Sequence, residues 1–279
     1  MFYTRLKVDC PTEFSEILIA ELGECGFDTF MENETGFEAY TEQDHYDASA
    51  LQWLKEKYAG TIEFTYSLSR VEKENWNEQW ENSFEPVVVE EACVVRAEFH
   101  RLSRSYPYEI VITPKMSFGT GHHATTWLML KLQLELEQMG MKVMDAGCGT
   151  TVLSIMAEKR GAASVDAFDI DEWSVENGNE NIKNNQCKKI RLRQGTVRSL
   201  SLDQDFDIIL ANINKNILLD EMEAYASKLV IGGKLVLSGF FESDAADLVA
   251  GARKMGFQEI RRASREGWCA LVLEKKEMS

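Results

Sequence analysis

The sequence lacks long apolar runs and contains little proline. None of its apolar stretches approaches the roughly 20 residues that a membrane-spanning helix needs. The N-terminus lacks the basic and then apolar pattern of a secretory signal, and the 4 prolines mark no disordered linker. The 6 cysteines form neither a C-x-x-C pair nor a zinc-like spacing, which is typical of reduced thiols. We therefore expect a soluble cytoplasmic protein that does not associate with a membrane.

Positive charge is scarce as well, and the shortage is uneven along the chain. The net charge is −16; residues 1–86 carry 19 acidic and 6 basic side chains, a net of −13, whereas residues 87–279 carry a net of −3. Binding of nucleic acid requires a basic face, so this distribution argues against direct contact with it. An acidic front part suits a basic partner protein, although a merely solubilising surface explains the charge equally well.

The chain length of 279 residues favours two domains. Residues 1–70 alternate as β-α-β-β-α-β, which predicts a small ferredoxin-like α+β domain. Residues 71–86 contain a short polar segment with Trp76 and Trp80 on one helical face, which indicates a linker helix. Residues 87–279 are expected to form the second domain.

In this second part, helices and strands alternate after a glycine-rich turn. The pattern predicts an α/β domain with a doubly wound, Rossmann-like sheet and a ligand at the carboxyl ends of its strands. Two final strands around Glu266 and Gly267 have no helix between them, so they are expected to pair antiparallel. The elements before them are expected at residues 125–139, 143–146, 152–160, 164–169, 172–184, 190–193, 207–211, 216–229, 234–238 and 242–255.

The stretch "MDAGCGTT" at residues 144–151 joins a strand to a helix. Gly147 and Gly149 allow the backbone to turn tightly against a ligand at the helix N-terminus, although a purely structural turn also fits. A third glycine is missing, because Thr151 and Val152 stand where one is usual. No phosphate-binding G-x-x-x-x-G-K-[ST] is present, which disfavours ATP or GTP.

Polar residues follow two further strands. Asp169 ends the next strand, at the distance where an acid accepts hydrogen bonds from ribose hydroxyls, and Asp171 is a candidate helix cap. Asn212 ends a buried strand and offers both an amide donor and a carbonyl acceptor, although it also suits a turn. Together these residues favour a cofactor that contains adenosine.

The loop "SFGTGHHATT" at residues 117–126 leads into a helix. Its glycines suit a segment that closes over a cofactor, and Thr125 or Thr126 is a candidate helix cap or ligand contact. The pair His122 and His123 has no companion cluster of His or Cys, so we expect no metal site.

Six segments resemble the ribosomal protein L11 methyltransferases, the PrmA family. They are "SFGTGHHATT", "VMDAGCGT" with "FDID" and "LANI", "WNEQWENSFEP", and the C-terminal "GFQEIRRASREGWCALVLEK". The resemblance covers nearly the whole chain and is most specific from residue 74 onward.

The resemblance implies a ferredoxin-like substrate-recognition domain, a linker helix and a seven-stranded class I methyltransferase domain that uses S-adenosylmethionine. It implies methylation of lysine ε-amines and of the N-terminal α-amine of ribosomal protein L11. Asn212 is then expected beside the transferable methyl as the catalytic residue. The residues expected to contact the cofactor are Phe118, Thr120, Thr126, Gly147, Gly149, Asp169 and Asn212.

Two positions depart from the family pattern: Thr151 replaces a small residue, and Ala124 replaces a common proline. If the helix has already begun at Thr151, its φ is negative and a side chain is tolerated; if φ is positive, the turn is strained and cofactor affinity suffers. The hydroxyl of Thr150 or Thr151 is a candidate to face the methionine carboxylate of the cofactor.

Other functions remain open at this point. One is a class I methyltransferase that acts on another protein or on a small molecule, although "NINK" replaces the Asn-Pro-Pro-Tyr of the glutamine and adenine enzymes. A nicotinamide oxidoreductase is disfavoured by Val152 and by the antiparallel closing hairpin. A non-catalytic binding module is the third alternative. The sequence leaves the oligomeric state open.

Overall fold

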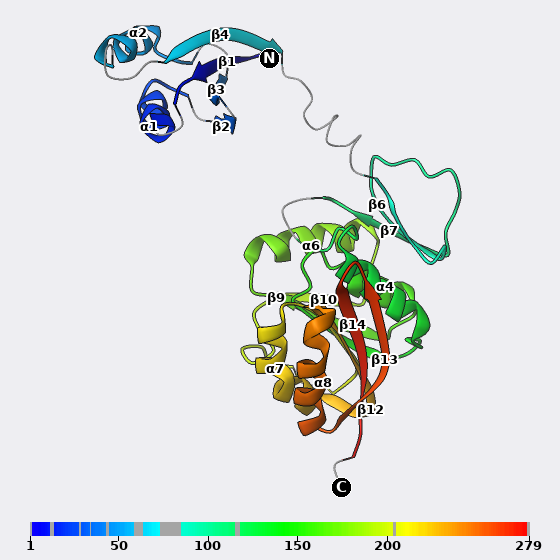
Figure 1. Ribbon diagram of the computed structural model, residues 1–279. Coiled ribbons are helices and arrows are strands. Elements are labelled where there is room, and N and C mark those ends of the chain that lie inside the picture. The colour runs from blue at the N-terminus through cyan, green and yellow to red at the C-terminus, as the bar shows by residue number, and fades with distance from the viewer. Residues whose placement is uncertain are drawn as a thin grey trace. The chain divides into compact units, whose positions relative to one another are not determined.

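The computed structural model describes residues 2–11, 14–27, 29–33, 35–42, 45–58, 64–72, 85–114, 118–202 and 205–277. The chain divides into two compact units, Met1–Phe84 and Glu85–Ser279 (Figure 1). The expected linker helix with Trp76 and Trp80 lies outside the described residues. No helix within the described ranges is long and apolar enough to cross a bilayer.

The described residues of the first unit form two helices and one sheet in the predicted order β-α-β-β-α-β. Its elements are β1 (Phe2–Asp9), α1 (Ser15–Glu24), β2 (Thr29–Asn33), β3 (Gly36–Glu42), α2 (Ala48–Lys57) and β4 (Thr65–Glu72). The strands pair antiparallel in the order β2-β3-β1-β4. Leu6 and Val8 alternate along β1 toward one face, where Leu18 of α1 and Leu54 of α2 complete an apolar core.

The second unit contains two sheets. Its elements are β5 (Val87–Val89), β6 (Cys93–Ala97), β7 (Tyr108–Ile112), α4 (Ala124–Glu135), β8 (Lys142–Ala146), α5 (Val152–Lys159), β9 (Ser164–Asp169), α6 (Glu172–Asn184), β10 (Ile190–Gln194), β11 (Phe206–Asn212), α7 (Lys215–Lys228), β12 (Leu229–Phe241), a 3-10 turn (Glu242–Asp244), α8 (Ala245–Lys254), β13 (Phe257–Arg265) and β14 (Trp268–Lys275). The strands β5, β6 and β7 form the smaller sheet.

The larger sheet has the strand order β10-β9-β8-β11-β12-β14-β13. The strands from β10 to β12 pair in parallel, whereas β14 runs antiparallel to both of its neighbours. The predicted α/β class and the predicted antiparallel hairpin are confirmed. Because parallel strands end at the same edge of a sheet, Ala146, Asp169 and Asn212 come together there.

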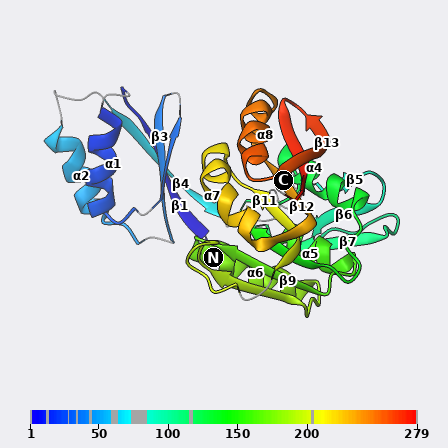
Figure 2. The same cartoon turned by 90° about the horizontal axis from the view of Figure 1, so that it is seen from below.

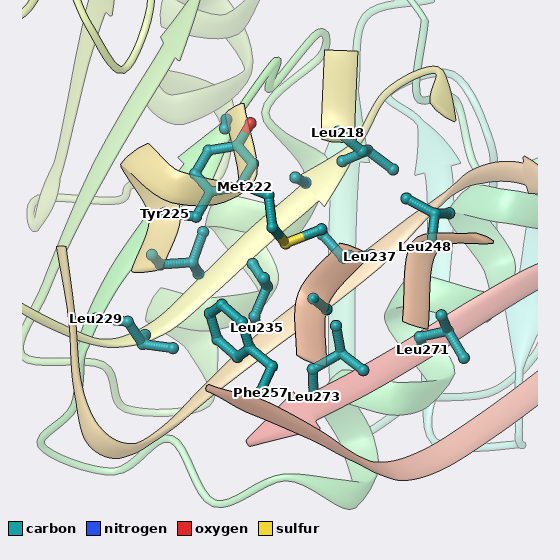
Figure 3. Close-up of a cluster of buried hydrophobic side chains, with 14 of the residues drawn as sticks. Leu218, Met222, Tyr225, Leu229, Leu235, Leu237, Leu248, Phe257, Leu271 and Leu273 are labelled. Atoms are coloured by element: carbon teal, nitrogen blue, oxygen red, sulfur yellow. The ribbon is translucent and has the colours of Figure 1, made fainter. Parts of the chain in front are cut away.

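Helices cover both faces of this sheet. Figure 2 shows α7 and α8 on one side of it, with α4 and α5 on the other. Under α7 and α8 lies the main core, in which Met222 of α7 points toward Leu237 of β12 (Figure 3). Tyr225 of α7 and Leu271 of β14 belong to the same buried cluster. This packing fixes α7, and therefore the residues that follow β11, against the sheet edge.

The two largest differences from the predicted element boundaries are at the end of α4 and at the start of β12. Helix α4 ends at Glu135, because the Glu137 carboxylate accepts hydrogen bonds from the backbone N–H groups of Gln138 and Met139, and Arg160 donates to the Leu136 carbonyl. Strand β12 begins at Leu229 rather than at residue 234: Leu229 pairs with Phe206, and a shift of register then accommodates the glycines that follow.

The turn between β8 and α5 has a left-handed backbone at three positions. These are Gly147 (φ 67°), Gly149 (φ 50°) and Thr151 (φ 63°). Of the two interpretations of Thr151, the one with positive φ is therefore correct. A residue with a Cβ atom pays about 1–2 kcal/mol for this conformation. The Thr151 side chain is fully buried, and its hydroxyl has no hydrogen-bond partner in the described part of the chain.

A carboxyl group lies buried beneath this turn. Asp145 of β8 is fully buried, and the Ser154 hydroxyl donates to its Oδ2 at 2.5 Å. Burial raises the pKa of Asp145 to about 7, because the ionised carboxylate would lose its hydration, and the hydrogen bonds from Ser154 offset part of this effect.

We predict that Thr151→Gly is more stable than Thr151→Ala by about 1 kcal/mol in free energy of unfolding. Both variants lose the buried hydroxyl and methyl groups of Thr151, but only glycine adopts the left-handed backbone conformation without strain. In an ordinary helix position alanine is the more stable of the two, so the sign of the difference is diagnostic. Urea denaturation of both variants measures it, and a more stable alanine variant would show that Thr151 is unstrained.

We also predict a pH dependence of stability that originates at Asp145. The folded protein keeps this proton up to about pH 7, whereas the unfolded chain releases it near 3.8, the ordinary pKa of an aspartate side chain. Between these values the folded state binds more protons, so the free energy of unfolding falls by up to about 1.4 kcal/mol per pH unit as pH rises.

Asp145→Asn removes this contribution, which flattens the decline when unfolding is followed by urea between about pH 5 and pH 7. The control Asp171→Asn removes an exposed carboxyl whose pKa is lowered by hydrogen bonds from Ser174, so it leaves the slope in this window unchanged. Equal slopes in wild type and Asp145→Asn would contradict the assignment.

Candidate cofactor and acceptor site

A cavity of about 390 Å³ opens at the carboxyl ends of β8, β9 and β11. It is lined by Phe118, Gly147, Gly149, Phe168, Asp169, Ile170, Asp171, Ser174, Gly195, Thr196, Asn212, Ile213, Ile217 and Glu221. Five of the seven residues expected to contact the cofactor are therefore brought together here. The two others, Thr120 and Thr126, do not line it.

The glycine-rich turn has no room for side chains. A Cβ atom at Gly147 would lie 2.4 Å from Cγ2 of Ile213, and one at Gly149 would lie 2.3 Å from the Phe118 carbonyl oxygen. The N–H groups of Gly147 and Cys148 donate to the Phe168 carbonyl at 2.9 and 3.1 Å, which ties the turn to the end of β9. At Gly149 glycine is required because the backbone of Phe118 approaches so closely, and at Gly147 it is favoured by the positive φ and by the nearby Ile213 side chain.

The loop at residues 118–121 is fastened to the same turn. The N–H of Thr150 donates to the Phe118 carbonyl at 2.9 Å, and its hydroxyl donates to the Gly119 carbonyl at 2.7 Å. The Thr150 hydroxyl therefore already donates its hydrogen bond to the loop. The buried Thr151 hydroxyl does not line the cavity. Phe118 remains half exposed, and its ring lies at the cavity mouth.

Asp169 is held as a fixed acceptor. Its Oδ2 accepts the N–H of Gly149 at 2.9 Å, and its Oδ1 accepts the N–H of Asp171 at 3.0 Å. Each carboxylate oxygen has a further lone pair, so this group can accept two hydroxyl donors from the cavity. Asp171 caps α6 by accepting the N–H of Ser174, which confirms its predicted capping role.

The two polar atoms of the Asn212 side-chain amide differ in their hydrogen bonding. Its Nδ2 donates to Oγ1 of Thr126 at 3.4 Å, whereas its Oδ1 is buried and has no hydrogen-bond partner in the described part of the chain. Thr126 is fully buried on α4, so it reaches the site only through this contact. A buried acceptor without a partner is costly unless a ligand supplies a donor.

A second cavity of about 250 Å³ adjoins the first and shares Phe118, Asn212 and Ile213 with it. Its aromatic walls pack on one another: the ring centroids of His123 and Trp268 lie 4.6 Å apart, and those of Phe118 and His123 lie 5.2 Å apart. Sequence reasoning did not place Trp268 at the site, because no local pattern connects this strand with α4.

The histidine pair has structural roles. His123, rather than a threonine, caps α4: its Nδ1 accepts the N–H of Thr125 at 3.3 Å. His122 contacts the Thr120 hydroxyl and the Glu85 carbonyl. Within the described ranges, no group of three or more potential metal ligands occurs.

The charged residues around the first cavity disfavour anionic ligands such as a pyrophosphate. Among the described residues, those that line it include Asp169, Asp171 and Glu221 but no lysine or arginine. A pyrophosphate would meet uncompensated negative charge here, whereas a cationic ligand is favoured. Burial raises the pKa of Cys148 well above its usual range, so this thiol stays protonated and is not a nucleophile.

These features fit S-adenosylmethionine. Asp169 matches the ribose hydroxyls, the glycine turn accepts a closely approaching chain, and the acidic lining suits a sulfonium cation. Residues 17–276 match the family model described as ribosomal protein L11 methyltransferase (PrmA). The chain is 44% identical over 259 residues to a "Ribosomal protein L11 methyltransferase" of Porphyromonas gingivalis, covering 92% of this chain and 89% of that protein.

Further relatives agree. A protein of the same name from Bacteroides fragilis is 38% identical, with 94% of each chain covered. A crystal structure of ribosomal protein L11 methylase from Lactobacillus delbrueckii subsp. bulgaricus superposes with a TM-score of 0.64 at 26% identity, covering 70% of this chain and 100% of that one. The chain therefore belongs to the ribosomal protein L11 methyltransferase (PrmA) family and is a class I, S-adenosylmethionine-dependent protein methyltransferase.

Proposed function

We propose that this enzyme methylates lysine ε-amines and the N-terminal α-amine of ribosomal protein L11, the substrate in the names of its relatives. The observation that carries the proposal is the unpartnered Oδ1 of Asn212, at the junction of the two cavities. An incoming amine supplies the missing donor. Such a substrate implies action in the cytoplasm, on free protein or on ribosomes.

The first cavity is proposed to hold the cofactor. Asp169 accepts the ribose hydroxyls, while Gly147 and Gly149 allow the methionine part to lie against the turn. Phe118 covers the cofactor, and Thr120 belongs to the same loop. When bound, S-adenosylmethionine supplies an electrophilic methyl group, so the protein has mainly to align the acceptor.

The second cavity is proposed to hold the acceptor. The apolar stem of a lysine lies along the rings of His123 and Trp268, and its nitrogen reaches Asn212. A lysine in water has a pKa near 10.4, and desolvation beside a cationic cofactor favours its neutral form. Asn212 Oδ1 then accepts an amine hydrogen and aims the lone pair, while Thr126 keeps the amide in this orientation.

Residues 1–70 are proposed to recognise the substrate. They belong to the part of the chain with a net charge of −13, which attracts a basic ribosomal protein. We retain the ferredoxin-like assignment for residues 1–70, the linker at 71–86 and the methyltransferase domain at 87–279 as part of this proposal.

We predict that Asn212→Ala lowers turnover of L11 about 100-fold or more, because the amine loses the group that orients it. Cofactor affinity should change far less, since Asn212 is expected to contact the acceptor more directly than the cofactor. Mass spectrometry of L11 gives the rate, and calorimetry gives the affinity. Asn216→Ala, at an exposed position of α7 outside both cavities, is the matched control. Unchanged turnover in Asn212→Ala would refute this role.

We also predict that deleting residues 1–70 leaves cofactor binding intact but abolishes methylation of full-length L11. The residues that line both cavities lie beyond this segment. Calorimetry with the cofactor is the control for folding of the shortened enzyme. If the shortened enzyme still methylates full-length L11 at the wild-type rate, residues 1–70 do not recognise the substrate.

A further inference from the structure

One carboxylate in the cofactor cavity has no part in the function proposed above. Glu221 lies in the second turn of α7, lines the first cavity and is only 9% exposed. The buried hydroxyl of Tyr225 donates a hydrogen bond to its Oε2. One neutral donor does not satisfy a carboxylate, which has about four acceptor positions. A ligand donor inside the cavity would lower the cost of burying this charge.

No cation in the described structure forms an ion pair with Glu221 that would explain it as a structural pair. The nearby guanidinium of Arg198 pairs instead with the Asp220 carboxylate at 2.7 Å and bonds the Asp220 backbone carbonyl at 2.6 Å. The two acids are neighbours in sequence, but one faces Arg198 and the other lines the cavity. Glu221 can therefore accept a hydrogen bond from a ligand, whereas Asp220 forms an ion pair at the protein surface.

From its place in the cavity, Glu221 is expected to face the base of the cofactor. Asp169 ends β9, whereas Glu221 belongs to α7, which follows β11 on the far side of β8. Apolar lining residues accompany these two acids: Ile170 directly follows Asp169, and Ile213 and Ile217 lead from the end of β11 along α7. A ribose at Asp169 therefore directs its base over apolar side chains toward Glu221.

The other polar group at this end is already engaged. The N–H of Thr196 donates to the Ser199 hydroxyl at 2.8 Å, and the Thr196 hydroxyl bonds the same serine. Adenine presents an exocyclic amino group, a donor, on its edge, whereas a 6-oxopurine presents an acceptor there. At this position a carboxylate accepts from the amino group of adenine and repels the carbonyl oxygen of the 6-oxopurine.

We propose that Glu221 accepts a hydrogen bond from the exocyclic amino group of the adenine and so selects adenine over 6-oxopurine cofactors. The proposal rests on the ribose position at Asp169 given above. Tyr225 is a positioning residue, because its hydroxyl holds Glu221 and does not line the cavity. Burial and the Glu221 carboxylate raise the pKa of Tyr225, so it remains a donor.

The test is calorimetric binding of S-adenosylhomocysteine and of S-inosylhomocysteine, its 6-oxo analogue, to the full chain. We expect wild type to prefer the adenine ligand about 100-fold. In Glu221→Gln the preference should fall to less than about threefold, because an amide donates to the 6-oxo group as readily as it accepts from the amine. Asp220→Asn removes the neighbouring charge and should keep the wild-type preference.

Tyr225→Phe keeps the Glu221 carboxylate but removes the hydroxyl that holds it in place, so we expect a preference between those of wild type and Glu221→Gln. This variant also tests the proposal if Glu221→Gln does not fold. A wild-type preference in both Glu221→Gln and Tyr225→Phe would overturn the proposal. The assay contains no L11, so a wrong substrate assignment does not affect it. Asp169→Ala should weaken both ligands equally, and a selective loss of one would contradict the ribose position on which the proposal rests.

Discussion

The site depends on the close approach of two chain segments to the turn after β8, at one edge of the parallel sheet. Phe118 of the loop before α4 and Ile213 after β11 both press on the turn after β8, at distances that leave no room for a Cβ atom at Gly149 or Gly147. Two hydrogen bonds from Thr150 fasten the loop in this position. The strands bring these segments together because they are parallel and end at the same edge. The cavity, the Asp169 carboxylate and the Asn212 amide all take their places from that arrangement.

The chemistry of the site then depends on which buried hydrogen-bonding atoms lack a partner in the described part of the chain. Buried hydrogen-bonding atoms normally have partners. Around the turn, Thr150, Asp169 and Asp171 obey this rule, whereas the Thr151 hydroxyl and Asn212 Oδ1 have no partner in the described part of the chain. Of these two residues, Asn212 lines both cavities and Thr151 lines neither. An acceptor without a partner, between an acid-lined cavity and an aromatic one, suits a site where an amine meets a cationic methyl donor. The enzyme has to align the reactants rather than activate them, and no nucleophilic or metal-bound group is required.

Much of this arrangement is predictable from the sequence. Alternating periodicity and the edge rule place Gly147, Asp169 and Asn212 together without coordinates, because each ends or follows a strand of the same parallel sheet. The sign of φ at Thr151 was not predictable, since the apolar pattern does not fix whether a helix begins one residue earlier. The pairing of His123 with Trp268 was missed because it joins α4 to a distant hairpin. Glu221 was missed because its pattern on α7 is that of an ordinary surface acid.

The most direct test of the central claim is the mass of ribosomal protein L11 after incubation with the wild-type enzyme and S-adenosylmethionine. Transfer to its amino groups predicts a gain in whole methyl increments, located by peptide mapping on lysine side chains and on the N-terminal amine. An unchanged mass, under conditions in which calorimetry shows that the enzyme has bound the cofactor, would contradict the assignment of L11 as the substrate.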